Sequence, residues 1–228
     1  MTLLTLVVLA GLLSLGRWQL HRAEEKRALF DAFAAGTDAT LTVGPGAAPV
    51  SRYARVQARG AFDATRQVLI DNMVSAAGQA GYYVITPFAL EGGGWILVNR
   101  GWVPVGVSRA QRPDIPVDSD VRSIHGRADN MPSPGIQLGQ RETLTAPFPV
   151  VAAFPNHAEI ELLLREQNWN RAAELILLDP EERDGYVREW TPPGFPPLRH
   201  IGYAVQWFGL AAALVVIYFV TNSRKAAA

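Results

Sequence analysis

The stretch RHIGYAVQWFGLAAALVVIYFV, residues 199–220, decides the architecture that the sequence predicts. It overlaps a run of 23 residues, 201–223, that has no charged side chain and is followed by Arg224 and Lys225. A buried core helix rarely needs so long an uncharged run, and in hydrocarbon a helix satisfies its own backbone groups. Aromatic side chains lie near both ends of the run, as in the interfacial belts of membrane helices. We therefore expect a transmembrane helix over residues 201–223 and a short tail over 224–228.

A second apolar run lies at the start of the chain. Residues 2–16 carry no charge, and apolar side chains continue to Leu20. Residues 2–20 would form roughly 28 Å of helix, close to the hydrocarbon thickness of a bilayer. A cleaved signal peptide is the alternative, but no basic segment precedes the run and no A-x-A site follows it. We expect a retained transmembrane helix over residues 1–20.

The residues between the two spans, 21–200, are enough for one domain of normal size. Strand patterns dominate this segment, and the clearest is a hairpin in which 82–90 and 95–105 flank the turn EGGG. The segment HAEIELLLREQNW has helical spacing, so a helical insertion is expected over about 156–169. The predicted fold class is a membrane α+β protein: two transmembrane helices flank a β-rich, barrel-like extramembrane domain.

Composition excludes several functional classes. The chain has 21 basic and 21 acidic residues, so no basic surface for nucleic acid is predicted. It has no cysteine, which rules out disulfides, Cys-ligated zinc and covalent c-type haem. No HExxH, GxSxG or phosphate-loop pattern is present. We therefore do not expect an enzyme.

One group of residues points to a cofactor. In a hairpin of two spans, the end of the first helix and the start of the second reach the same membrane face, which places His21 and His200 at similar depth with Gln19. An imidazole, flat aromatic side chains and arginines could hold iron, ring and propionates of a haem, while an ordinary aromatic and basic membrane belt is the alternative. The candidate cofactor-binding residues are His200, as ligand of the haem iron, with Tyr203, Trp207, Gln206, Trp18, Arg17 and Arg199.

Three motifs, in order along the chain, carry a family resemblance. LGRWQLHRAEEK (15–26), VNRGWVP (98–104) and RHIGYAVQWFGLA (199–211) resemble the Surfeit-locus-one (Surf-one or Shy-one) family of cytochrome c oxidase assembly factors, and GYYVITPF (81–88) fits as well. The resemblance implies a non-enzymatic factor that binds haem a and aids its delivery to the oxidase catalytic subunit. His200 matches the family's proposed haem-linked histidine. Implied partners are that subunit, the lipid bilayer and, as a further candidate, haem a synthase.

The resemblance also bears on location. Arg224 and Lys225 favour a cytoplasmic C-terminus, whereas the bases that follow the first span favour the opposite orientation. The resemblance implies a multi-pass protein of the bacterial plasma membrane, with both termini cytoplasmic and the main domain periplasmic. No mitochondrial transit peptide is recognisable.

A different class of function stays open at this point. In it the protein is a cofactor-free membrane scaffold that stabilises oxidase assembly intermediates. VNRGWVP would then form the partner surface, and His200 would be only interfacial.

Overall fold

The computed structural model describes residues 2–36, 39–106, 108–133 and 143–226. The chain divides into two compact units. One contains both terminal helices, and the other is the domain Gly36–Trp190. Each unit is described below by itself.

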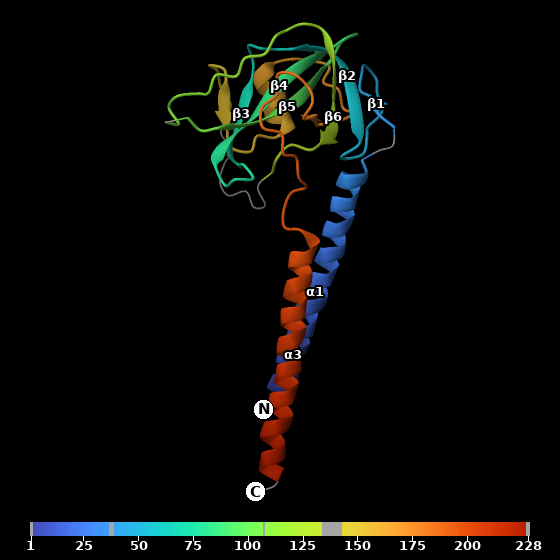
Figure 1. The fold of residues 1–228 in the computed structure, drawn as a ribbon, viewed down its shortest axis with the longest axis vertical. Coiled ribbons are helices and arrows are strands. Elements are labelled where there is room, and N and C mark those ends of the chain that lie inside the picture. Colours follow the sequence, from blue (N-terminus) through green and yellow to red (C-terminus); the bar gives the residue numbers. More distant parts are fainter. Residues whose placement is uncertain (1, 37–38, 107, 134–142, 227–228) are drawn as a thin grey trace. The chain divides into compact units, whose positions relative to one another are not determined.

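The domain Gly36–Trp190 is built on a closed five-stranded barrel, which confirms the predicted fold class (Figure 1). Each barrel strand pairs with two others, in the ring β2–β6–β8–β5–β4 and back to β2. The barrel strands are β2 (Arg55–Phe62), β4 (Ala80–Leu90), β5 (Trp95–Pro104), β6 (Arg122–Asp129) and β8 (Leu175–Leu178). Three further strands extend the sheet: β1 (Leu41–Thr42), β3 (Val68–Val74) and β7 (Val150–Ala152).

Strand periodicity divides the apolar residues between two cores. Alternate residues of β5, Ile96 and Val98, lie in a cluster with Phe62 and Phe88 that fills the barrel. Leu97, between them, belongs to a second cluster that includes Ile160 of the domain's short helix. This is the two-residue period of a strand, which sends neighbouring side chains to opposite faces. Both faces of β5 are therefore buried.

The expected hairpin forms β4 and β5. The two strands are antiparallel, with Ala89 opposite Trp95. The turn needs its glycines, because Gly92, Gly93 and Gly94 all have positive φ.

Helix α2, His157–Leu164, is the expected insertion, but it is shorter than 156–169. Asn156 caps its start by accepting from the Glu159 backbone N–H, and the Glu159 side chain accepts from the Asn156 N–H in return. Arg165 ends the helix in a left-handed conformation, with φ 55°. The residues after it turn away to return the chain to β8.

The other unit is a pair of long antiparallel helices, α1 (Thr2–Ala35) and α3 (Pro197–Ala226) (Figure 1). They lie side by side, and the two chain ends are at the same end of the pair. Both are long and apolar enough to cross a membrane. Helix α1 continues well past residue 20, and α3 begins before residue 201. The lipid boundaries expected at residues 20 and 201 stay predictions, since a helix does not have to end where the bilayer ends.

Candidate functional site at the helix hairpin

The two terminal helices meet along one stripe of each, which we call the seam. Between residues 5 and 26, the residues of α1 that are not exposed recur at alternating spacings of four and three. Helix α3 contains a stripe with the same spacing, and Ile201 and Val215 beside that stripe are also half-buried. The seam consists of Thr5, Leu9, Leu12, Gly16, Gln19, Ala23 and Lys26 with Pro197, His200, Ala204, Trp207, Ala211, Leu214 and Tyr218. A mean spacing of 3.5 residues is the coiled-coil period, and small residues in the seam let two helices approach closely.

Three contacts fix the antiparallel register of the helix hairpin. The Thr2 hydroxyl lies 3.1 Å from the Tyr218 hydroxyl at one end. Lys26 Nζ donates to the carbonyl of Pro193, 3.0 Å away, at the other end. Between them, Gln19 meets His200. In all three pairs the residue numbers sum to 219 or 220, so the register is unbroken along the hairpin.

The contact between Gln19 and His200 is the chemical centre of this hairpin. Gln19 Oε1 lies 2.9 Å from His200 Nδ1, and both side chains are half-buried. The pair lies close to the end of the uncharged segment of each helix. Those segments, residues 2–16 of α1 and 201–223 of α3, contain no charged side chain. Because Gln19 holds Nδ1 of His200, the other ring nitrogen, Nε2, remains available to a ligand.

The remaining candidate residues lie around this pair in different ways. Trp207 shares the seam with His200 and is half-buried. Tyr203, one turn from His200, is 40% exposed, and Trp18, beside Gln19, is 53% exposed. Gln206 is also exposed and lies off the seam. Large aromatic surface therefore remains uncovered within a turn of the imidazole.

The two arginines lie near the same level of the hairpin. Arg17 is two residues from Gln19, and Arg199 adjoins His200, so each is within about 3 Å of the pair along its helix axis. Both are exposed. The Arg199 guanidinium lies 3.8 Å from the centre of the Phe195 ring. Within the described part of the chain, neither arginine has an acidic partner.

His21 is separated from His200, although the two share similar depth. It follows Gln19 by two positions, about 200° around the helix, so it faces away from the seam. Its side chain is 69% exposed, and its Nε2 lies 3.3 Å from Glu25 Oε1 on the same helix. In this hairpin the two imidazoles cannot converge on one ligand.

The motif VNRGWVP is not a surface, contrary to its role in the scaffold hypothesis. Residues 98–103 are all buried, because both faces of β5 are covered. Arg100 follows Ile96 and Val98 on the barrel's inner face and is 0% exposed. Its five N–H donors meet five neutral acceptors: Thr86 Oγ1, Gln67 Oε1 and the carbonyls of Ile115, Pro116 and Asp184. Burial lowers the pKa of Arg100 below its ordinary value. The motif is structural.

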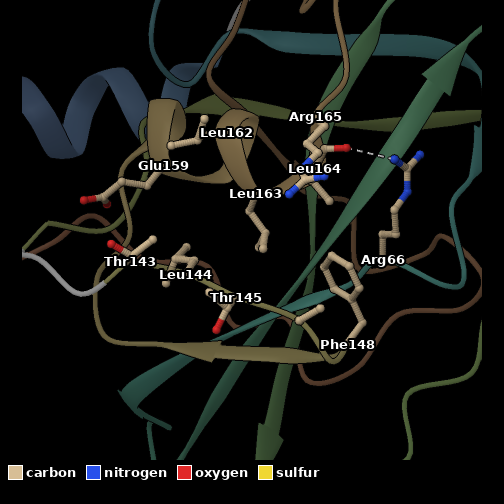
Figure 2. Close-up of a pocket in the computed structure, with 11 residues that line it drawn as sticks. Arg66, Thr143, Leu144, Thr145, Phe148, Glu159, Leu162, Leu163, Leu164 and Arg165 are labelled. Atoms are coloured by element: carbon tan, nitrogen blue, oxygen red, sulfur yellow. Dashed lines mark hydrogen bonds between the residues drawn. The ribbon is translucent and has the colours of Figure 1, made fainter.

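The barrel domain has a cavity of about 690 Å³ between α2 and residues 143–148 (Figure 2). Its walls are mostly apolar, with Leu163 and Phe148 pointing into it. Arg66 lies at one side, but its guanidinium is held by Asp63, by Glu166 and by the carbonyl of Leu164. The other polar residues of the lining are Thr143, Thr145, Glu159 and Arg165, and nothing in the described structure shows what the cavity holds, so we assign it no role.

Among the described residues, no three His, Asp or Glu side chains come close enough to hold a metal ion. In the domain, His157 Nδ1 lies 2.8 Å from Glu161 Oε1, and burial lowers the pKa of His157. An imidazole that is mostly covered and packs edge-on against Trp169 fits a structural role.

Gln19 is the candidate site residue whose contact the sequence does not reveal. The sequence predicts its depth, but nothing in the sequence marks it as the partner of His200. The four-three spacing identifies Gln19 only when the register of the two helices is known. Nearly every residue of 2–20 is apolar or small, so hydrophobicity alone shows no preferred face of the helix.

Comparison with known proteins gives one consistent result. The model of the SURF1 family matches residues 6–212. Surfeit locus protein 1 of Takifugu rubripes is 28% identical, and the match covers 96% of each chain. Surfeit locus protein 1 of Xenopus tropicalis is 29% identical over 98% of this chain and 76% of that one. A SURF1-like protein of Rickettsia felis is 28% identical over 96% and 95%.

Proposed function

Because this chain belongs to the SURF1 family, whose members are known as cytochrome oxidase assembly factors, we propose that it carries haem a to the catalytic subunit of a haem–copper cytochrome c oxidase. The observation that supports this most is the half-buried His200, held through Nδ1 by Gln19 at the level where charge begins on the helix hairpin. Such an imidazole can coordinate iron through Nε2.

The residues around His200 suit the rest of a haem. Trp207 on the seam and the exposed Tyr203 and Trp18 offer flat apolar surface for the macrocycle. Arg17 and Arg199, both exposed, offer charge-assisted hydrogen bonds to propionates. When bound, the haem supplies only an iron centre to be delivered, so no bond-making chemistry is required of the protein. We accordingly propose a non-enzymatic carrier.

A carrier must also release what it holds. Each additional 1.4 kcal/mol of affinity slows dissociation about tenfold at a fixed association rate. His21 faces away from the seam, so His200 would be the single ligand from this hairpin. One histidine beside exposed aromatic surface suits transfer better than a closed site with two ligands.

The hairpin also suits a membrane location. Two antiparallel helices of spanning length place both chain ends on one side of a bilayer. We propose the bacterial plasma membrane, with both termini cytoplasmic and the barrel domain periplasmic. The oxidase catalytic subunit is the proposed partner, and haem a synthase, the source of the haem, is a second.

The cofactor-free scaffold is the second candidate. One observation favours it: no three His, Asp or Glu side chains converge in the described structure, so one imidazole alone would have to hold the iron. VNRGWVP cannot be its docking surface, because residues 98–103 are buried. The scaffold would have to use another face of the domain.

Complementation in the cell separates the two candidates. Deleting the gene from its own host should lower the haem a content of the oxidase catalytic subunit, and wild-type protein should restore it. We expect His200→Ala to be present in the membrane at normal level yet to fail in restoring haem a content. Full restoration by His200→Ala would instead support the scaffold, while Glu91→Gln, on an exposed barrel turn, serves as a matched control that should restore fully.

A further inference from the structure

Near the middle of the seam, the polar side chains of Gln19 and His200 form a pair. Both side chains are half-buried. The seam positions on either side of it in α1 are Gly16 and Ala23, and both are buried. Their small side chains bring the helices together at the level of the pair. The imidazole therefore cannot turn freely, and its Nδ1 stays directed at α1.

The atoms that meet determine the protonation pattern of the ring. Gln19 presents Oε1, which only accepts hydrogen bonds, to His200 Nδ1 at 2.9 Å. Nδ1 must therefore carry the proton and donate it. In a neutral imidazole the proton is then absent from Nε2, whose lone pair is free. A histidine that binds a metal through one ring nitrogen is typically oriented by a hydrogen bond that its other ring nitrogen donates.

We propose that Gln19 is a positioning residue that holds His200 as the Nδ1–H tautomer and directs the Nε2 lone pair away from α1 toward the incoming iron. The identity of the iron ligand as haem a rests on the proposed function, whereas the tautomer does not. A carboxylate in place of the Gln19 amide would make the imidazole a stronger electron donor to the iron and so hinder release.

The first test needs no haem. Full-length protein in detergent micelles, labelled with ¹⁵N at histidine, should show His200 with a protonated Nδ1 and an unprotonated Nε2. Gln19→Leu should shift the ring toward the Nε2–H tautomer that free histidine side chains favour. The proposal is overturned if wild-type His200 carries its proton on Nε2, or if Gln19→Leu keeps the wild-type pattern.

A matched control separates hydrogen bonding from packing. Leu9→Ala removes apolar volume from the same seam, about three turns away from Gln19. It should loosen the hairpin but leave the tautomer of His200 unchanged. A change of tautomer in Leu9→Ala equal to that in Gln19→Leu would mean that packing, and not the amide, sets the ring.

The second test adds haem a and reads affinity and reduction potential. Gln19→Leu should weaken binding by about 10- to 100-fold, and Gln19→Glu should lower the reduction potential because the ring becomes a stronger donor. Equal affinity and potential in wild type and Gln19→Leu would contradict the positioning role. If the wild type binds no haem but shows the expected tautomer, the haem carrier fails and the positioning of His200 by Gln19 stands.

Discussion

Replacing Arg100 with leucine should lower the free energy of unfolding of the barrel domain by about 4 kcal/mol. The guanidinium is fully buried and donates all five of its N–H groups. Leucine would remove a donor from the Gln67 amide oxygen and from the carbonyls of Ile115, Pro116 and Asp184. The first three keep another donor, from Thr86, Gln67 and Tyr186 respectively. The Asp184 carbonyl loses the donor that it has from Arg100, and a buried acceptor without a donor costs about 1–3 kcal/mol. Lysine should rescue little, because one ammonium cannot reach acceptors spread around a planar fork.

Urea unfolding of the full chain in detergent measures this effect through tryptophan fluorescence, since Trp102 is buried on the same strand. The matched control is Arg59→Leu on strand β2 of the same barrel. Arg59 forms an ion pair with Glu91 at 2.8 Å, but both side chains are more than half exposed, so its loss should cost less than about 1 kcal/mol. Similar midpoints for the two variants would show that the buried network does not stabilise the barrel.

Replacing Gly16 with leucine should break the close packing of the helix hairpin. A Cβ atom at Gly16 would lie 2.7 Å from the Phe208 ring, which is closer than real contacts allow. The end of the Phe208 ring could move to admit a Cβ atom, but leucine brings three further carbon atoms into the seam. We therefore expect the helices to separate, by about 2 Å within the usual range of interhelical distances. Because the chain contains no cysteine, spin labels can be introduced at two sites only, the exposed Leu13 and Leu210. The distance distribution between them should lengthen and broaden.

The same substitution at Gly11 is the control. No atom lies within 4 Å of a Cβ built at Gly11, on the same helix. Gly11→Leu adds the same side chain and should leave the distance distribution narrow. If Gly16→Leu also leaves it narrow, the helices do not pack along the seam as described, and the contact between Gln19 and His200 loses its basis.

The sequence predicts the barrel strands well because local pattern and burial agree there. The apolar runs 82–90 and 95–105 predict β4 and β5, and the glycine turn between them predicts the central hairpin. The sequence does not predict the two-residue β1 or the three-residue β7, because each of them exists only through parallel pairing with a distant strand. The early end of α2 depends on the left-handed Arg165, a residue type that gives no local signal for a helix stop.

The candidate site could be predicted only in part. His200 and its depth follow from the position of charges along the chain. The partner on the other helix does not, because the residues of a membrane span are apolar on every side and the seam is chosen by small side chains such as Gly16 and Ala204. Arg100 shows the opposite case. Its two-residue spacing from Val98 predicts an inward direction, but a charged residue would normally be assigned to the surface.

The most direct measurement is the visible absorption spectrum of the full-length protein purified from cells that make haem a. The carrier account predicts a haem band in the wild type and its loss in His200→Ala, with both proteins equally folded and equally abundant in the membrane. A colourless wild type that still binds the oxidase catalytic subunit would contradict the account, as would a His200→Ala protein that keeps the full band.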